Sequence, residues 1–134
     1  GVAVGEVGGG DGARLGEFRL SVLGPQRRYA EENDGSVVLW VDVRGASVLL
    51  PGDIGALAQR DLGPLRPDVL LLPHHGAATT DLDWLAATVG SLAVVSVGRN
   101  TYGHPDPGVV GVVADLGTPL VSTLDVGDIS WSPP

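Results

Sequence analysis

The sequence predicts an α/β domain in which a mixed sheet carries flanking helices. Three observations lead to this prediction: a clean polar–apolar alternation near the N-terminus, a hairpin pattern after it, and alternating strand-like and helix-like segments from Pro67 onward. Short turns join antiparallel strands and helical crossovers join parallel ones, so both kinds of pairing are expected. At 134 residues, the chain has the size of one domain and can bury roughly two-thirds of its unfolded surface.

The first segment, residues 1–16, is rich in glycine and shows no sustained period. We predict a flexible or partial N-terminal segment there, and a single domain over residues 17–134. Residues 17–23 alternate between polar and apolar side chains, which is typical of a strand with one solvated face, and Gly24-Pro25 ends it.

Two β-branched, apolar segments, 36–43 and 46–50, are separated by Arg44-Gly45 and predict a hairpin. Asp81 is suited to cap a helix and Pro107 to begin one. The remaining predicted elements are helices over 54–62, 81–88 and 107–116 and strands over 69–72, 93–97, 120–123 and 128–131. No internal repeat or domain linker interrupts this order.

Composition excludes several classes of protein. A hydrophobic fraction of 43% and a charged fraction of 18% indicate a folded chain. The longest apolar runs, such as 69–73, are far shorter than the ~20 residues of a membrane-spanning helix, and no signal peptide can be read at the N-terminus. The formal net charge of −8 would repel a phosphate backbone, which disfavours simple electrostatic binding of nucleic acid.

Four side chains that could carry chemistry follow predicted strands: Asp53, His74, His75 and His104. Polar groups at strand ends lie at the rim of a sheet, where α/β folds gather their ligand sites, so these residues are candidates for one cluster. The chain has no cysteine. Imidazole and carboxylate ligands without thiolates suit zinc, manganese or iron, and the chemistry they predict is metal-assisted hydrolysis.

Each of these residues also has a structural interpretation. Asp53, in a Gly-Asp pair after a strand, could be a helix N-cap. At least one histidine of the His74-His75 pair could be a loop-packing residue, and Gly103-His104-Pro105 is typical of a rigid turn. The coincidence of three such features in one chain favours the functional interpretation.

Four segments of the chain, in order, resemble the ComEC branch of the metallo-β-lactamase superfamily. The resemblance extends from about Glu17 to the C-terminus. The segments are Asn33-Asp34-Gly35-Ser36-Val37-Val38-Leu39, Leu49-Leu50-Pro51-Gly52-Asp53, Leu72-Pro73-His74-His75-Gly76, and Ser96-Val97-Gly98-Arg99-Asn100 running into Tyr102-Gly103-His104-Pro105.

The resemblance implies the C-terminal half of a metallo-β-lactamase-like αββα domain with two divalent metal ions, zinc or manganese, in the complete domain. It implies that Asp53 bridges the ions and that His104 binds the second one. His74 and His75 are implied as catalytic residues that contact metal or phosphate. Ser36 and Asn100 are implied to lie near the substrate or behind the ligands.

The sequence also departs from the family pattern. The family's first motif, His-x-Asp-x-Asp-His or His-x-His-x-Asp-His, has no counterpart, so at most half of the ligands are present and this segment could hold no metal at all. Pro51 stands where the family often has Thr, and Ala77 where it often has Ser. A half-domain with helices on one sheet face would expose apolar surface on the other, so we expect the missing N-terminal half or a second copy of the segment to cover it.

The function implied by the resemblance is that of a nuclease in a competence protein, degrading the DNA strand that is not transported. The domain would lie on the extracellular or periplasmic face of a bacterial membrane protein, beside its channel portion. Two alternatives remain: a hydrolase of a small phosphodiester or ester, such as a choline-phosphate esterase, and an inactive structural half-domain. We expect the segment alone to bind metal weakly and to be catalytically silent.

Overall fold

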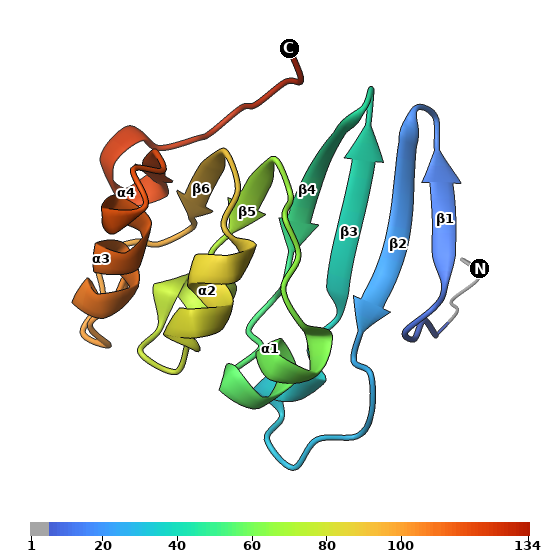
Figure 1. Ribbon diagram of the computed structural model, residues 1–134, viewed down its shortest axis with the longest axis horizontal. Helices are drawn as coiled ribbons and strands as arrows, with labels where there is room; N and C mark the ends of the chain where they lie inside the picture. The colour runs from blue at the N-terminus through green and yellow to red at the C-terminus, as the bar shows by residue number, and fades with distance from the viewer. Residues whose placement is uncertain (1–5) are drawn as a thin grey trace.

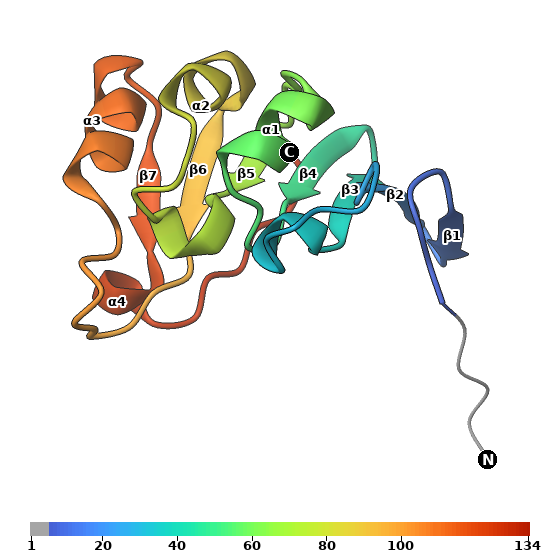
Figure 2. The same ribbon diagram turned by 90° about the horizontal axis from the view of Figure 1, so that it is seen from below.

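The computed structural model describes residues 6–134 and contains a sheet whose strands follow one another in chain order, β1 to β7 (Figure 1 and Figure 2). Strands β1 to β4 pair antiparallel, and β4 to β7 pair parallel. The predicted mixed α/β sheet is therefore confirmed. The strands are β1 (Gly12–Leu15), β2 (Phe18–Gly24), β3 (Val38–Val43), β4 (Ala46–Leu50), β5 (Val69–Leu71), β6 (Leu92–Val95) and β7 (Leu120–Ser122).

Helices α1, α2 and α3 lie on one face of this sheet (Figure 2). The three helices therefore leave the other face of the sheet without a helical layer. The helices are α1 (Ala56–Leu62), α2 (Leu82–Thr88), α3 (Pro107–Asp115) and α4 (Thr123–Val126), and two short 3-10 turns are η1 (Asn33–Gly35) and η2 (Pro73–Gly76).

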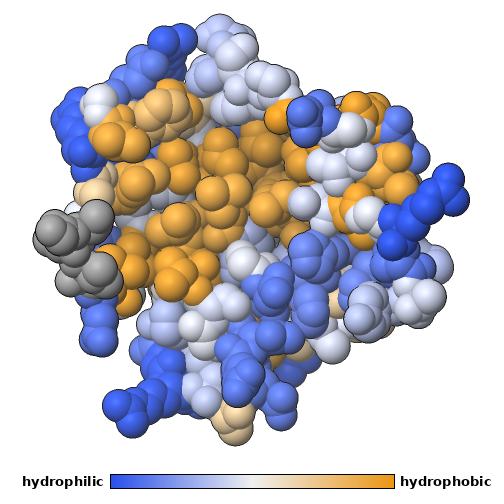
Figure 3. Space-filling model, turned by 180° about the vertical axis from the view of Figure 1, so that it is seen from behind, coloured by the Kyte–Doolittle hydropathy of each residue, from blue (hydrophilic) through white to orange (hydrophobic). Residues whose placement is uncertain are grey.

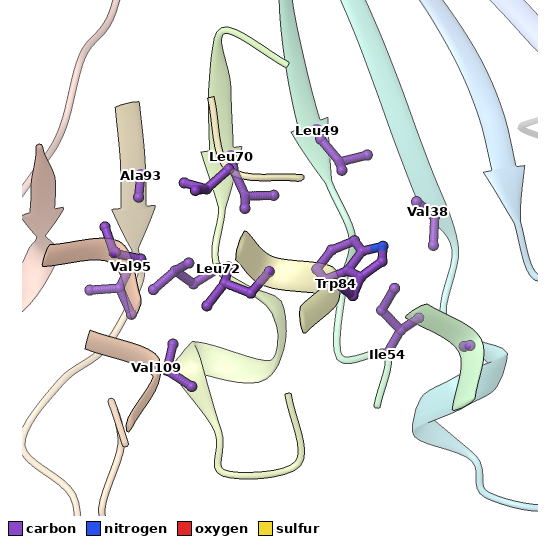
Figure 4. Close-up of a cluster of buried hydrophobic side chains, with 13 residues drawn as sticks. Val38, Leu49, Ile54, Leu70, Leu72, Trp84, Ala93, Val95 and Val109 are labelled. Atoms are coloured by element: carbon purple, nitrogen blue, oxygen red, sulfur yellow. The ribbon is translucent and has the colours of Figure 1, made fainter. Parts of the chain in front are cut away.

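The hydrophobic core lies between the sheet and these helices (Figure 4). Leu49, Leu70 and Ala93, from three neighbouring strands, are completely buried there. Leu85 of α2 and Val109 of α3 pack against them from the helical layer. Since successive side chains of a strand point to opposite faces, the residues between these core positions must face away from the helices.

The opposite face of the sheet is apolar and open. Val48, Leu50, Leu71 and Val94 alternate with the core residues and are only partly buried. Figure 3 shows this face as a continuous hydrophobic surface. Large contiguous apolar patches are unusual on monomeric proteins and mark association surfaces.

Several predicted details are confirmed. The hairpin lies at β3 and β4, with Arg44 at φ 50° in the turn between them. Asp81 caps α2 by accepting a hydrogen bond from the backbone N–H of Trp84 at 2.9 Å, and this bond, together with the ion pair to Arg60, lowers the pKa of the Asp81 carboxyl. Pro107 occupies the first turn of α3.

One predicted strand is wrong, and two other predicted segments differ in part from the structure. Residues 128–131 form no strand, because the chain leaves the sheet through α4 and Gly127, whose φ is 75°. The strand predicted over 120–123 ends at Ser122, whose side chain caps α4. Within the segment 1–16, Gly12–Leu15 forms β1 and pairs with β2, while residues 1–5 lie outside the described residues.

Each helix within residues 6–134 is too short or too polar to cross a lipid bilayer.

Candidate functional site

The loops that carry the candidate residues all follow parallel strands. Asp53 lies after β4, His74 and His75 lie after β5, and His104 lies on the longer connection after β6. Because these strands run parallel, their carboxyl ends share one edge of the sheet, where α/β folds place their ligands. The tertiary structure therefore brings the predicted residues to the same side of the molecule.

The two adjacent histidines have a left-handed backbone. His74 has φ 47° and His75 has φ 57°, a region that residues other than glycine rarely adopt. The backbone N–H of His74 donates to the carbonyl oxygen of Gly52 at 3.0 Å, which ties this turn to the loop of Asp53. Non-glycine residues in such conformations persist where the surrounding structure imposes them, and they concentrate at functional sites.

His75 has one defined ring contact. Its Nδ1 lies 2.7 Å from the carbonyl oxygen of Ser96. Since a carbonyl oxygen can only accept, Nδ1 must carry the hydrogen. The other ring nitrogen, Nε2, is then the one that can face a ligand, which is how backbone carbonyls orient histidine ligands in metal sites.

His104 is positioned by a loop that Asn100 organises. Asn100 Oδ1 accepts from the backbone N–H groups of Tyr102, Gly103 and His104 at 3.0, 3.0 and 3.1 Å. Its Nδ2 donates to the carbonyl oxygens of Gly98 and His104 at 3.0 and 2.8 Å. The ring of His104 lies 5.7 Å from that of His74, measured between centroids.

Asp53 lies in a hollow of about 390 Å³ that also contains His74. The hydroxyl of Ser36 is 3.4 Å from the backbone nitrogen of Asp53, and buried Asp34 accepts from the N–H of Gly55 at 2.7 Å, so both support this loop. Asp53 is not a helix cap, because Gly55 occupies that position before α1. We call this space the acidic hollow; it is lined by Glu31, Asn33, Asp34, Asp53, Gly55, Ala56, His74 and Thr79.

A second hollow, of about 310 Å³, contains His75 and His104. It takes in Asn100, which the sequence predicts to be near the substrate, but no carboxylate. We call it the Arg99 hollow; it is lined by His75, Ser96, Val97, Gly98, Arg99, Asn100, Tyr102, His104 and Thr123.

The four candidate residues are thus divided between two hollows, with His74 and His104 facing each other across the boundary. The sequence does not indicate Glu31 as a site residue, because no motif or pattern in its polar loop marks it. Arg99 and Tyr102 lie on either side of Asn100 in the family-like segment 96–105, and that segment could have identified them. Within residues 6–134, no three His, Asp or Glu side chains come together closely enough to hold a metal ion.

The donor chemistry nevertheless suits part of a metal site. Imidazole and carboxylate groups match zinc and manganese. With zinc–nitrogen bonds of about 2.0–2.1 Å, the ring centres of two imidazoles on one ion lie roughly 5 to 6 Å apart. The 5.7 Å between His74 and His104 falls within that spacing. His74 and His104 are therefore spaced as two ligands of one ion would be, and Asp53 lines the same hollow as His74.

Replacing His74 by glycine is expected to stabilise the fold by about 1 kcal/mol, because the strain of a left-handed non-glycine residue exceeds the extra unfolded-state entropy of glycine. Among the described residues, the His74 ring makes no hydrogen bond that would be lost. The measurement is urea unfolding followed by circular dichroism. The control is His74→Ala, which keeps the strained backbone; an equal gain in that variant would rule out strain as the cause.

Comparison with characterised proteins gives two informative similarities. ComE operon protein 3 of Bacillus subtilis is 29% identical over 138 aligned positions, covering 98% of this chain and 18% of that protein. Competence protein ComA of Neisseria gonorrhoeae is 34% identical over 105 positions, covering 73% of this chain and 15% of that protein. No family model matches the chain.

The chain thus spans less than a fifth of the length of these relatives. Almost its whole length aligns with the first of them, including the loops that carry Asp53, His74, His75 and His104. Both relatives are named as competence proteins. This chain is therefore homologous to a segment of the ComEC-type DNA-uptake proteins, the family that its motifs resemble.

Proposed function

We propose that this chain is part of a metal-dependent phosphodiesterase that degrades the non-transported DNA strand in a competence DNA-uptake protein. One observation carries the proposal most strongly: the strained His74-His75 turn, which holds one ring 5.7 Å from His104 and the other against a backbone carbonyl. Backbone strain at a rim of polar side chains points to a function other than packing.

Asp53, His74 and His104 would hold divalent metal ions, zinc or manganese, together with ligands from outside residues 6–134. When bound, such ions act as Lewis acids on a phosphoryl oxygen. His75, whose ring is oriented by the carbonyl oxygen of Ser96, would contact the phosphate. Ser36 and Asn100 would keep the loops of Asp53 and His104 in place.

Calorimetric titration of the chain with Mn²⁺ and Zn²⁺ tests the ligand assignment. We expect weak binding that Asp53→Ala and His104→Ala each weaken by at least about tenfold, equivalent to about 1.4 kcal/mol. The matched control is Asp128→Ala, an exposed aspartate in the C-terminal segment, which should leave the affinity unchanged. Metal affinity that neither Asp53→Ala nor His104→Ala changes, or no binding at all, would favour an inactive structural half-domain.

The substrate class is tested on a longer protein that carries this segment. Cleavage of single-stranded DNA in the presence of manganese or zinc is expected, and Asp53→Ala should abolish it. Cleavage of a chromogenic phosphodiester without cleavage of DNA would indicate a hydrolase of small phosphodiesters or esters instead.

The apolar sheet face requires a partner in this proposal. The missing N-terminal half of the domain would cover Val48, Leu50, Leu71 and Val94, and the membrane channel portion of the parent protein would lie beyond it on the extracellular or periplasmic side. In the isolated chain, a second copy would take this place. Sedimentation equilibrium should then report a homodimer that Leu71→Lys converts to monomer, since a buried unpaired charge is costly.

A further inference from the structure

The two hollows differ in the charge of the side chains that line them, so they suit different ligands. Three carboxylates, Glu31, Asp34 and Asp53, line the acidic hollow, which would repel a phosphate unless cations were bound there. The lining of the Arg99 hollow has no carboxylate and contains a guanidinium and two imidazoles. On a chain with a net charge of −8, this is a place where an anionic group meets the guanidinium of Arg99 and no carboxylate.

Tyr102 stands at the rim of the Arg99 hollow with most of its ring in solvent. It is 83% exposed, more than any other large hydrophobic residue of the described chain. Its ring lies 6.1 Å from that of His104 at an interplanar angle of 21°, so the two aromatic planes are nearly parallel. An exposed aromatic plane gains free energy when another flat, apolar group covers it.

The loop beneath Tyr102 is already ordered without a ligand. Asn100 holds the backbone N–H of Tyr102 at 3.0 Å and those of the next two residues at similar distances. Because the backbone is held in this way, little conformational entropy of the loop has to be lost when a ligand stacks on the ring. The loop therefore presents a rigid aromatic platform beside a cationic hollow.

We propose that the Arg99 hollow binds one nucleotide of single-stranded DNA, with its base stacked on Tyr102 and its phosphate directed to the guanidinium of Arg99. The proposal rests on the proposed function in taking DNA as the ligand. It adds that the nucleotide beside the acidic hollow is held by stacking, which every base can provide, so recognition of the strand would be independent of sequence.

Fluorescence anisotropy with the isolated chain tests this site without metal. The probes are a labelled oligothymidylate of about eight nucleotides, within the usual site sizes of single-stranded DNA-binding modules, and an abasic strand of the same length. We expect the chain to bind the oligothymidylate about tenfold more tightly than the abasic strand, since each stacked base contributes about that factor or more. Tyr102→Ala should remove the preference, and Tyr102→Trp should keep it.

Two further variants separate stacking from charge. Leu116→Ala, at another exposed apolar side chain, should leave both affinities unchanged. Arg99→Ala should weaken both strands equally and make binding less dependent on salt. Equal affinity for the two strands, a preference that survives Tyr102→Ala, or no binding of either strand would overturn the proposal.

The results distinguish a failure of the stacking site from a failure of the proposed function. If metal titration depends on Asp53 and His104 while the abasic strand binds as well as the oligothymidylate, the hydrolase assignment stands and the stacking site is wrong. If the base preference depends on Tyr102 but no metal binds, the nucleotide site stands and the hydrolase assignment fails.

Discussion

Gly90→Ala is expected to abolish folding of the domain or to destabilise it by more than about 4 kcal/mol. A Cβ atom at position 90 would lie 1.7 Å from the carbonyl oxygen of Pro67 and 2.9 Å from its carbonyl carbon. Both neighbours belong to the backbone, so no rotation of a side chain relieves the overlap. The overlap can be relieved only if the two chain segments move apart.

The surrounding hydrogen bonds make that separation costly. The backbone N–H groups of Ser91 and Leu92 both donate to the carbonyl oxygen of Asp68, at 3.2 and 3.0 Å. These bonds fix the start of β6 against the start of β5, and Pro67, which precedes β5, is completely buried. Moving position 90 away from Pro67 would break the parallel pairing of β5 with β6.

Gly111→Ala is the matched control for this substitution. Position 111 lies inside α3, and a Cβ atom there would meet no atom within 4 Å outside its own helix. Because alanine favours a helix over glycine by about 1 kcal/mol, the control should be slightly more stable than the wild type. Urea unfolding measures both variants; an unchanged midpoint for Gly90→Ala would show that the two segments can separate without loss of structure.

Gln59→Leu is expected to lower the free energy of unfolding by roughly 3 kcal/mol, the cost of leaving two polar groups without partners. Gln59 is completely buried in α1. Its Nε2 donates to the carbonyl oxygen of Ile54 at 2.7 Å, and its Oε1 accepts from the N–H of Asp81 at 2.7 Å. Leucine fills a similar volume but can make neither bond, so the loss reports hydrogen bonding rather than packing.

This amide joins the loop of Asp53 to the start of α2, and its loss should also loosen the acidic hollow. The control is Gln26→Leu, at an exposed glutamine before η1, which should change stability by less than about 0.5 kcal/mol. Unfolding by guanidinium measures both variants. A loss below about 1 kcal/mol for Gln59→Leu would mean that water replaces the missing partners.

Most of the sheet could be predicted because its strands have a clear pattern. Residues 38–43 and 46–50 are apolar and β-branched around a short turn, and the parallel strands are short apolar runs between helices. β1 could not be found in this way, since all four of its residues are exposed and it is ordered by pairing with β2. α4, with only four residues, is too short to show a helical period.

The candidate site was predicted less completely than the fold. The motifs identified the loops of Asp53, His74 and His104, because polar residues after apolar strands mark a sheet edge. They did not indicate that Glu31 joins Asp53 in one hollow, nor that Arg99 and Tyr102 join His75 in another. Those groupings depend on how loops distant in sequence fold over the sheet edge.

The sequence by itself determined the order of elements from β2 to β7 apart from the short 3-10 turns, the sheet edge at which the polar residues gather, and the kinship with ComEC-type proteins, since all three are encoded in local patterns of residues. Only the tertiary structure decided the strained backbone of His74 and His75, the division of the site into an acidic and a cationic hollow, and the exposure of Tyr102. These depend on contacts between loops more than twenty residues apart, such as that of His75 with Ser96. A local pattern cannot contain the distance between two side chains that meet only after the sheet has formed.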